Sequence, residues 1–219
     1  MPTLILLRHG ESTANAEDRF GGWLDVALTG AGIRQAARAG RLIRAHGAEP
    51  DVVYTSVLRR AIDTANLALD EAGRAWIPVH RSWRLNERHY GALQGRTRAD
   101  AEAEFGRSQV AAWRRSYDAV PPVGPGTGSS GDDPRYVDLG AAAPRAESLA
   151  DVAHRLLPIW HDAIAPDLRA GRRVLVVAHG NSLRVLIKHI EGLSGEEVFA
   201  RDVPTGVPLY YSLYGDQDS

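Results

Sequence analysis

The sequence contains no cysteine among its 219 residues. This absence excludes disulfide bonds, thiolate nucleophiles and cysteine-based zinc sites. Long hydrophobic runs are also missing, because no apolar stretch approaches the roughly 18 residues of a membrane span. The apolar run at the N-terminus is too short for a secretory signal, and Arg8 and Glu11 follow it closely. We therefore expect a cytoplasmic protein with no membrane partner.

Charge of one sign is not in excess, since 26 Lys and Arg residues are balanced by 27 Asp and Glu residues. The net charge of −1 excludes a general electrostatic attraction to nucleic acid, so an anionic ligand would need a local cluster of arginines. Acidic and histidine residues with convincing metal-ligand spacing are also lacking, because Asp132 and Asp133 lie in a stretch rich in Gly and Pro. We expect no metal cofactor and no nucleic-acid partner.

The apolar pattern predicts strands that alternate with helices. The predicted strands are residues 3–7, 52–55, 77–79, 174–178 and 210–214. Helices are predicted from Thr29, as N-cap, to Gly47, then over residues 58–69, and finally after His179, where Asn181 or Ser182 would be the N-cap. This order predicts an α/β fold: a three-layer α/β/α sandwich with a mostly parallel central sheet.

The middle of the chain has a different composition. Residues 97–117 are charged and predicted to be helical, with Phe105, Val110 and Trp113 as their few large apolar residues. Residues 121–131 are rich in Pro, Gly and Ser, which is typical of a flexible loop. We interpret the region from about residue 88 to about residue 145 as a helical lid inserted into a single domain that spans residues 1–219.

Two histidines stand where apolar strands are predicted to end. His9 and His179 are each followed by glycine, and His179 also precedes a predicted helix. A lone histidine at a strand end is usually structural, but ligands of α/β folds bind beyond the carboxyl ends of the strands. If the two strands are adjacent, both imidazoles face one pocket. A neutral imidazole is a capable nucleophile near pH 7, so we predict that His9 carries a phosphoryl group and that His179 donates to the phosphoryl oxygens.

Arginines and one glutamate follow the same pattern. Arg8 precedes His9, and Arg60 comes just after the second predicted strand, where a guanidinium could hold phosphate with two hydrogen bonds. Glu87 could supply the general acid and base that transfer to or from a hydroxyl requires. Arg98, Arg114 and Arg115 lie on the predicted lid. A solvated surface is the ordinary interpretation of such charges, and a cationic ring around a doubly anionic substrate is the functional one.

Six segments together give the chain a family resemblance. They are LRHGES at residues 7–12, YTSVL with Arg60 and Ala61 at 54–61, LNERHYGALQG at 85–95, WRR at 113–115, AHGNSLR at 178–184 and PTGVPL at 204–209. In this order they resemble the histidine phosphatase superfamily and, within it, the cofactor-dependent phosphoglycerate mutases. The resemblance covers nearly the whole chain, and LNERHYGALQG is the segment that points to the mutase branch.

The resemblance implies a function and a set of roles. It implies interconversion of 3-phosphoglycerate and 2-phosphoglycerate through a phosphohistidine on His9, with 2,3-bisphosphoglycerate as the priming phosphate donor and no metal. Glu87 would be the proton donor and acceptor, and Arg8, Arg60 and His179 would hold the phosphoryl group. Family members are dimers or tetramers, which implies a homo-oligomer. The implied substrate-binding residues are Ser12, Asn15, Gly21, Gly22, Arg88, His89, Tyr90, Arg98, Arg114, Arg115, Gly180 and Asn181.

Departures from the family pattern keep an alternative open. The family usually has Trp at the position of Ala14, Thr at Gly21 and Lys at Arg98, and its members continue beyond Tyr214 with a longer tail that helps close the site. Loss of closure would admit water, which hydrolyses phosphohistidine. These changes favour a phosphatase, or a mutase that acts on another small phosphorylated acid. A non-catalytic ligand-binding protein is a third hypothesis, opposed by the presence of both histidines and of Glu87.

Overall fold

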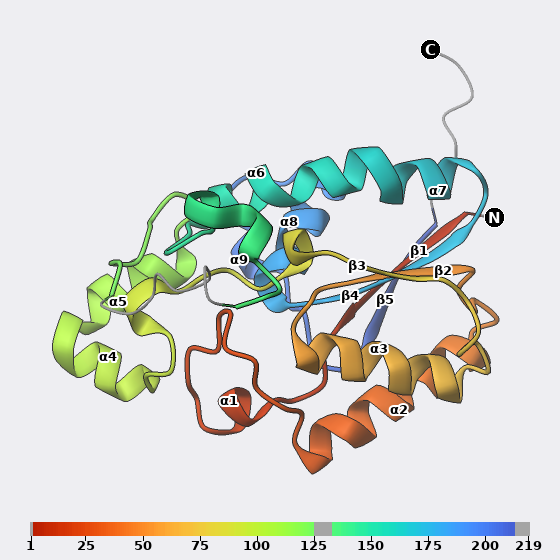
Figure 1. Cartoon of the computed structure of the whole chain (residues 1–219), viewed down its shortest axis with the longest axis horizontal. Coiled ribbons are helices and arrows are strands. Elements are labelled where there is room, and N and C mark those ends of the chain that lie inside the picture. The colour runs from red at the N-terminus through yellow and green to blue at the C-terminus, as the bar shows by residue number, and fades with distance from the viewer. Residues whose placement is uncertain (1, 125–132, 213–219) are drawn as a thin grey trace.

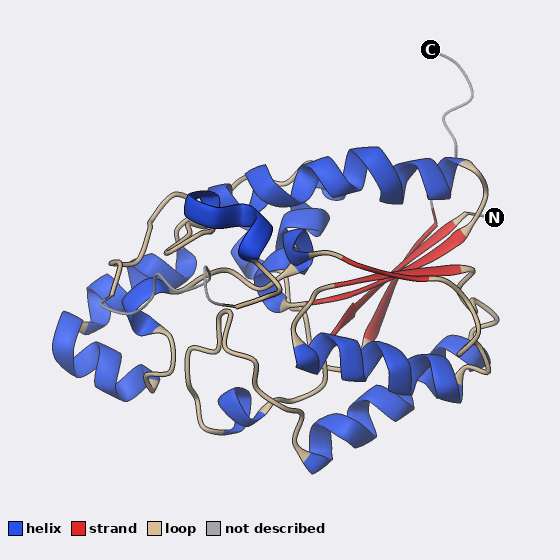
Figure 2. Ribbon diagram, in the orientation of Figure 1, coloured by secondary structure: helices blue, strands red, loops and turns tan. Residues whose placement is uncertain are grey.

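The computed structural model describes residues 2–124 and 133–212. Its core is a five-stranded sheet with helices on both faces, as Figures 1 and 2 show. The strand order is β3-β2-β4-β1-β5, and all neighbours are parallel except β5, which runs antiparallel to β1. The strands are β1 (Thr3–Arg8), β2 (Val52–Thr55), β3 (Val79–Arg81), β4 (Arg173–Ala178) and β5 (Pro208–Ser212). The predicted α/β sandwich with a mostly parallel sheet is confirmed.

The helices form two layers and a separate outer group. Helices α2 (Gly30–Ala45) and α3 (Arg59–Glu71) cover one face of the sheet. The other face is covered by α6 (Leu149–Ile159), α7 (Ala165–Arg169) and α8 (Gly180–Glu191). A π-helical turn at Trp160–Ile164 joins α6 to α7. The remaining helices are α1 (Thr13–Ala16), α4 (Arg98–Phe105), α5 (Arg107–Arg115) and α9 (Glu197–Ala200), with 3₁₀ turns at Trp83–Leu85, Gly91–Leu93 and Val137–Ala142.

Each central strand is buried on both faces, which explains its continuous apolar sequence. In β1, Leu4 and Leu6 pack in the cluster that contains α6 and α8. Ile5 and Leu7 pack in the opposite cluster, which contains α2 and α3. All four side chains are fully buried. Burial of an aliphatic side chain stabilises a fold by about 1.5–3 kcal/mol, so this strand is among the best anchored parts of the molecule.

Several predicted boundaries are confirmed and others are wrong. Thr29 is the N-cap of α2, and its side chain accepts from the backbone N–H of Gly32. The predicted helix at 97–117 is wrong as a single helix, because it is divided at Gly106, whose φ of 84° suits glycine. The predicted cap at Asn181 or Ser182 is also wrong, since His179 is the N-cap of α8 and makes no side-chain capping bond.

Two further predictions, the loop at 121–131 and the strand at 210–214, extend beyond the described residues. The predicted loop at 121–131 lies mostly outside the described residues, as does the end of the strand predicted at 210–214. The described part of that last strand begins two residues earlier, at Pro208. Among residues 2–124 and 133–212, no helix has both the length and the apolar composition to cross a membrane.

Candidate active site

Strand register brings the two histidines together. β1 and β4 are paired in parallel from Thr3 with Arg173 to Arg8 with Ala178, so the next residues are His9 and His179. The backbone N–H of His9 also donates to the carbonyl of Ala178 at 3.0 Å. As a result the two ring centroids lie 5.0 Å apart, and both residues are buried.

His9 is held in the tautomer that a nucleophile requires. Its Nδ1 lies 2.7 Å from the carbonyl oxygen of Gly10, and a carbonyl can only accept, so Nδ1 carries the proton. Nε2 therefore keeps its lone pair. Burial lowers the pKa of His9 well below its ordinary value of 6.5, and the guanidinium groups of Arg60 and Arg8 lower it further. The ring is thus neutral at physiological pH and available for attack.

His179 is placed to donate a hydrogen bond. Its Nε2 lies 2.8 Å from the hydroxyl of Ser56, while its buried Nδ1 has no partner among the described residues. If the hydroxyl donates to Nε2, Nδ1 carries the free N–H. Burial lowers the pKa of His179 well below 6.5, and the nearby Arg60 and His9 lower it further. An unpartnered buried N–H beside the ring of His9 is a donor that an incoming oxyanion could bind.

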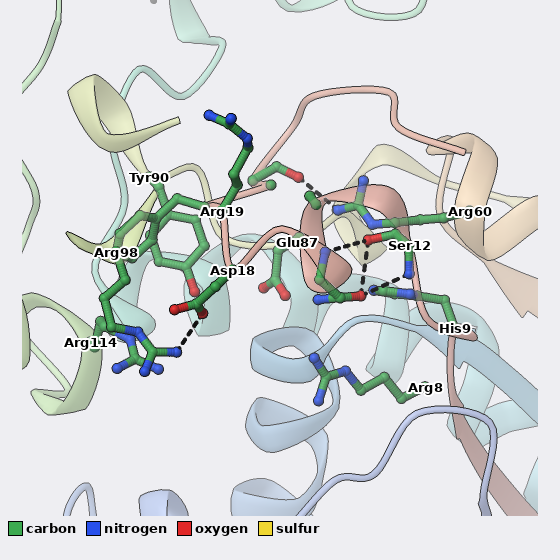
Figure 3. Close-up of a pocket in the computed structure, with 15 residues that line it drawn as sticks. Arg8, His9, Ser12, Asp18, Arg19, Arg60, Glu87, Tyr90, Arg98 and Arg114 are labelled. Atoms are coloured by element: carbon green, nitrogen blue, oxygen red, sulfur yellow. Dashed lines mark hydrogen bonds and ion pairs between the residues drawn. The ribbon is translucent and has the colours of Figure 1, made fainter. Parts of the chain in front are cut away.

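Two arginines stand beside His9. Arg60 is buried, and its guanidinium donates to the carbonyls of Leu24 and Gly22, both at 2.8 Å. Burial lowers the pKa of Arg60 to about 10, which still leaves it charged at pH 7. Arg8 donates from Nη1 to the carbonyl of Val203, and its buried Nε has no partner in the part of the chain that the structure describes. Figure 3 shows Arg60 and Arg8 on opposite sides of His9.

Glu87 reaches the same cavity from the loop after β3. Its Oε1 accepts from the backbone N–H of Arg88 at 2.7 Å and from the side-chain amide of Asn181 at 2.9 Å. Within the described residues its Oε2 makes no hydrogen bond. In Figure 3 Glu87 lies between His9 on one side and Arg98 and Arg114 on the other. One carboxylate oxygen is therefore fixed and the other is left for proton transfer.

The side chains of Arg8, His9, Arg60 and Glu87 line a cavity of about 200 Å³. A neighbouring cavity of about 570 Å³ shares Arg8, Glu87, Tyr90 and Arg114 with it. Together the walls contain seven arginines and two acidic residues, which favours an anionic ligand. The first cavity is lined by Arg8, His9, Ser12, Ala14, Asn15, Asp18, Arg19, Phe20, Gly21, Gly22, Arg60, Glu87, Tyr90, Arg98 and Arg114. The second adds Arg115, Gly180, Asn181, Arg184 and Phe199.

Most of the predicted site residues line these cavities, but three do not. His179 is fully buried, with its ring centroid 5.0 Å from that of His9. Arg88 is fully buried, with its guanidinium 4.7 Å from the ring centre of Tyr90, and its side-chain nitrogens have no described partner. His89 is buried, and its Nδ1 accepts from the backbone N–H of Gly91. A direct ligand role for Arg88 or His89 would therefore require movement.

Six residues that line the cavities were not among the predicted site residues: Ala14, Asp18, Arg19, Phe20, Arg184 and Phe199. Arg184 lies one turn after the start of α8, and its Nη1 and the guanidinium of Arg8 both lie close to Gly180. Its position could have been inferred from the spacing, because residue 184 shares a helix face with residues 180 and 181. Asp18 gives no comparable signal in the sequence, since an acidic residue is unexpected in the wall of an anion site.

Asp18 pairs with Arg98 across the cavity. Its carboxylate lies 2.7 Å from Nη2 of Arg98, and its backbone has a φ of 50°, which is uncommon outside glycine. Both side chains are partly exposed. Burial lowers the pKa of Arg114, and its neighbours Arg98 and Arg115 lower it further. The carboxylate of Asp18 therefore offsets part of a crowded positive charge that a ligand anion would otherwise neutralise.

We expect Asp18→Asn to bind anionic substrate more tightly. Asparagine tolerates the left-handed backbone, so the change removes the charge and keeps the shape. The KM for a phosphorylated acid should fall about two- to fivefold, as for removal of a partly exposed competing ion. Steady-state kinetics at low and high salt measure this, with Asp70→Asn on the exposed end of α3 as the matched control. An unchanged or higher KM would show that Asp18 does not compete with the ligand.

Buried neutral histidines make stability depend on pH. Burial lowers the pKa of His89 to about 4, and those of His9 and His179 are well below 6.5. The unfolded chain therefore binds more protons than the folded one below about pH 6.5, and stability falls as pH falls. From pH 7 to pH 5 His89 should cost about 2 kcal/mol, and His9 and His179 should add to the loss. Urea unfolding at both pH values measures the loss, and equal stabilities would contradict it.

Glycines shape the wall beside Arg60. Gly22 has a φ of 50°, and a Cβ there would lie 2.1 Å from Oε1 of Gln94, so only glycine fits. Gly21 differs, because a Cβ there would meet only the Cβ of Ala14, at 3.5 Å. The positions of Ala14 and Gly21 therefore leave space in the cavity wall.

The sequence pattern of the histidine phosphatase superfamily (branch 1) matches residues 4–135 and 129–207. The chain belongs to this superfamily, and the resemblance predicted from the motifs is confirmed. Among curated proteins it is similar to two enzymes named 2,3-bisphosphoglycerate-dependent phosphoglycerate mutase. The one from Thermobifida fusca is 57% identical, over 99% of this chain and 89% of its own length. The one from Mycobacterium leprae is 58% identical, over 98% of this chain and 87% of its own length.

Solved structures with the same fold include phosphatases. A mycobacterial glucosyl-3-phosphoglycerate phosphatase in complex with VO3 has a TM-score of 0.75 and 28% identity, over 97% of this chain and 93% of its own. The YhfR protein of Bacillus stearothermophilus has a TM-score of 0.75 and 25% identity, over 97% and 92%. The fold is therefore common to mutases and phosphatases, and the sequence likeness is much higher to the mutases.

Proposed function

We propose that this protein is a 2,3-bisphosphoglycerate-dependent phosphoglycerate mutase, an isomerase that interconverts 3-phosphoglycerate and 2-phosphoglycerate through a phosphohistidine on His9. The observation that carries the proposal is the free Nε2 of His9, which lies among Arg8, Arg60 and His179 in a site lined by cations. The identity of 55–58% to mutases over nearly their whole length supports the mutase over the phosphatase alternative.

The residues present fit a small acid with two anionic groups. Near His9 the unpartnered Nε of Arg8 and Nδ1 of His179 are donors for one phosphoryl group. At the other end Arg98, Arg114 and Arg115 are available for the second phosphate or the carboxylate. When bound, 2,3-bisphosphoglycerate supplies the first phosphoryl group. These fixed cations would provide the charge stabilisation that the reaction needs without a metal.

Each transfer can be written with this chain's own groups. Nε2 of His9 forms a bond to phosphorus while the bond from phosphorus to the ester oxygen breaks. The departing oxygen takes a proton from Glu87, which becomes a carboxylate. In the return step the free 2-hydroxyl of 3-phosphoglycerate gives its proton to Glu87 as its oxygen attacks phosphorus and the bond to Nε2 breaks. The N–H of His179 and the two guanidinium groups bind the phosphoryl oxygens throughout.

We also propose roles for the less central parts. The segment from about residue 88 to about residue 145 would act as a lid, since α5 contributes Arg114 and Arg115 to the cavities. Self-association as a dimer or tetramer is proposed because Trp76 is 75% exposed just before the edge strand β3. Cytoplasmic residence, with no nucleic-acid or membrane partner, fits the absence of cysteine and the net charge of −1.

One assay tests the proposed function. Purified protein is given 3-phosphoglycerate with and without 2,3-bisphosphoglycerate, and 2-phosphoglycerate and inorganic phosphate are both measured. We expect isomerisation that the bisphosphate stimulates and that EDTA does not change. Release of inorganic phosphate without the isomer would overturn the mutase and support the phosphatase alternative, for which the space beside Ala14 and Gly21 would then account.

A further inference from the structure

A buried ion pair lies behind the loop that carries Glu87. Arg155 and Glu147 are 5% and 2% exposed, and two bonds join them, Nε to Oε1 at 2.6 Å and Nη2 to Oε2 at 3.0 Å. Neither residue lines a described cavity. Buried ion pairs rarely stabilise a fold more than apolar residues of similar size, so the pair needs another explanation.

The guanidinium of Arg155 binds the backbone of that loop. Its Nη1 donates to the carbonyl of Arg84 at 2.6 Å, and its Nη2 donates to the carbonyls of Asn86 and Glu87 at 3.0 and 2.9 Å. After the 3₁₀ turn at Trp83–Leu85 the loop has no helical or strand hydrogen bonds to satisfy these carbonyls. One side chain of α6 therefore binds three carbonyls of the 3₁₀ turn and of the loop that follows it.

The carboxylate of Glu147 binds the other end of the loop. Its Oε2 accepts from the backbone N–H of His89, and its own N–H donates to the carbonyl of His89, both at 2.8 Å. Glu147 immediately precedes the capping residue Ser148 of α6. The ion pair thus fastens residues 84–89 to the first turns of α6.

Glu87 is held from two directions. Its carbonyl accepts from Arg155 and from Nε1 of Trp23, the latter at 2.6 Å. Its carboxylate Oε1 is bound by Asn181 at the start of α8, next to His179. The position of Oε2 relative to His9 therefore depends on both attachments, and the attachment on the backbone side is made by Arg155 together with Trp23.

We propose that Arg155 and Glu147 are positioning residues that fix Glu87 for proton transfer in the reaction. This inference rests on the proposed function, in which Glu87 protonates the departing oxygen. A shift of a catalytic group by about 1 Å can cost about 100-fold in rate. Loss of the pair should therefore slow those transfers that need a proton and spare those that do not.

Two phosphoryl donors separate these cases. 2,3-Bisphosphoglycerate leaves an alkoxide that needs a proton, whereas acetyl phosphate leaves acetate, which needs none. Both place the same phosphoryl group on His9, and acid-labile phosphohistidine is measured at saturating donor. For Arg155→Lys we expect labelling from the bisphosphate to slow about 10- to 100-fold, with little change in the concentration that gives half-maximal rate. Labelling from acetyl phosphate should stay within about threefold of wild type.

The test includes a matched control and further variants for the case in which Arg155→Lys does not fold. Arg173→Lys makes the same change in a pair with Asp51 at the opposite end of β4, and both donors should be used at wild-type rates. If Arg155→Lys does not fold, as judged by circular dichroism, Glu147→Gln and the double variant Glu147→Leu with Arg155→Met are assayed in the same way. The double variant leaves no unpaired buried charge.

Three outcomes would overturn the positioning role. They are an equal loss with both donors, no loss with either donor, or failure of all three variants to fold. Failure of the proposed function looks different. Wild-type protein would then release phosphate from 3-phosphoglycerate without isomerising it, and that ester would replace the bisphosphate in the comparison with acetyl phosphate.

Discussion

His9→Ala should lose both acid-labile phosphate labelling and mutase turnover, the latter by at least about 10⁴-fold, as is typical when a nucleophile is removed. The free Nε2 of His9 is the atom placed to form the bond to phosphorus, because Gly10 holds the proton on Nδ1. Incubation with labelled 2,3-bisphosphoglycerate followed by acid treatment measures the covalent step, and a coupled assay measures turnover.

Controls for this variant address folding and position. His9→Asn keeps a donor toward the carbonyl of Gly10 and should be equally inactive, which would separate chemistry from the loss of packing. His154→Ala on the exposed side of α6 should behave as wild type. Retained turnover in a folded His9→Ala protein would refute the assignment of the nucleophile. Loss of labelling in wild-type protein would favour a role in binding alone.

Glu87→Gln should lower kcat by about 10²- to 10⁴-fold and change KM by no more than about threefold. The amide oxygen of glutamine can still accept from Asn181 and from the backbone of Arg88, so the loop and the ligand contacts should be preserved. The lost property is the exchange of a proton with the substrate oxygen. Single-turnover labelling of His9 from 2,3-bisphosphoglycerate isolates this step from product release.

Glu71→Gln provides the matched control for that substitution. Glu71 is on α3 and pairs with Arg41, far from the carboxyl ends of the strands. Its loss should leave both kinetic constants unchanged. A kcat for Glu87→Gln within about threefold of wild type would assign the acid and base role to another group.

The sheet and the two histidines could be predicted from sequence because their signals are local. Apolar runs predict β1, β2 and β4, and the glycine after each histidine marks the end of a strand. The sequence predicts a shared pocket for the two histidines only if β1 and β4 are adjacent, and their parallel register shows that they are. The N-cap of α8 was harder to predict. His179 begins this helix by its backbone geometry alone, without the side-chain hydrogen bond that Asn181 or Ser182 would make.

Other features depend on contacts between distant segments and leave no local pattern. Helix α6 and the π-helical turn after it were not predicted, although they cover part of one face of the sheet. The pair of Arg155 with Glu147 looks like ordinary helix charge in the sequence, and only the burial of both residues shows otherwise. The sequence also does not show that Arg88 is buried against the ring of Tyr90. Glu87 and Tyr90, in the same segment, both line the cavity, so Arg88 would be expected to line it as well.

The pairing of the first strand with β4 also determines when the protein can become active during its own synthesis. His9 is synthesised long before the strand that positions it and the imidazole beside it, which belong to residues 173–179. Arg184 and the start of α8 emerge later still. A growing chain therefore carries His9 without these partners until β4 has been made and can pair with β1.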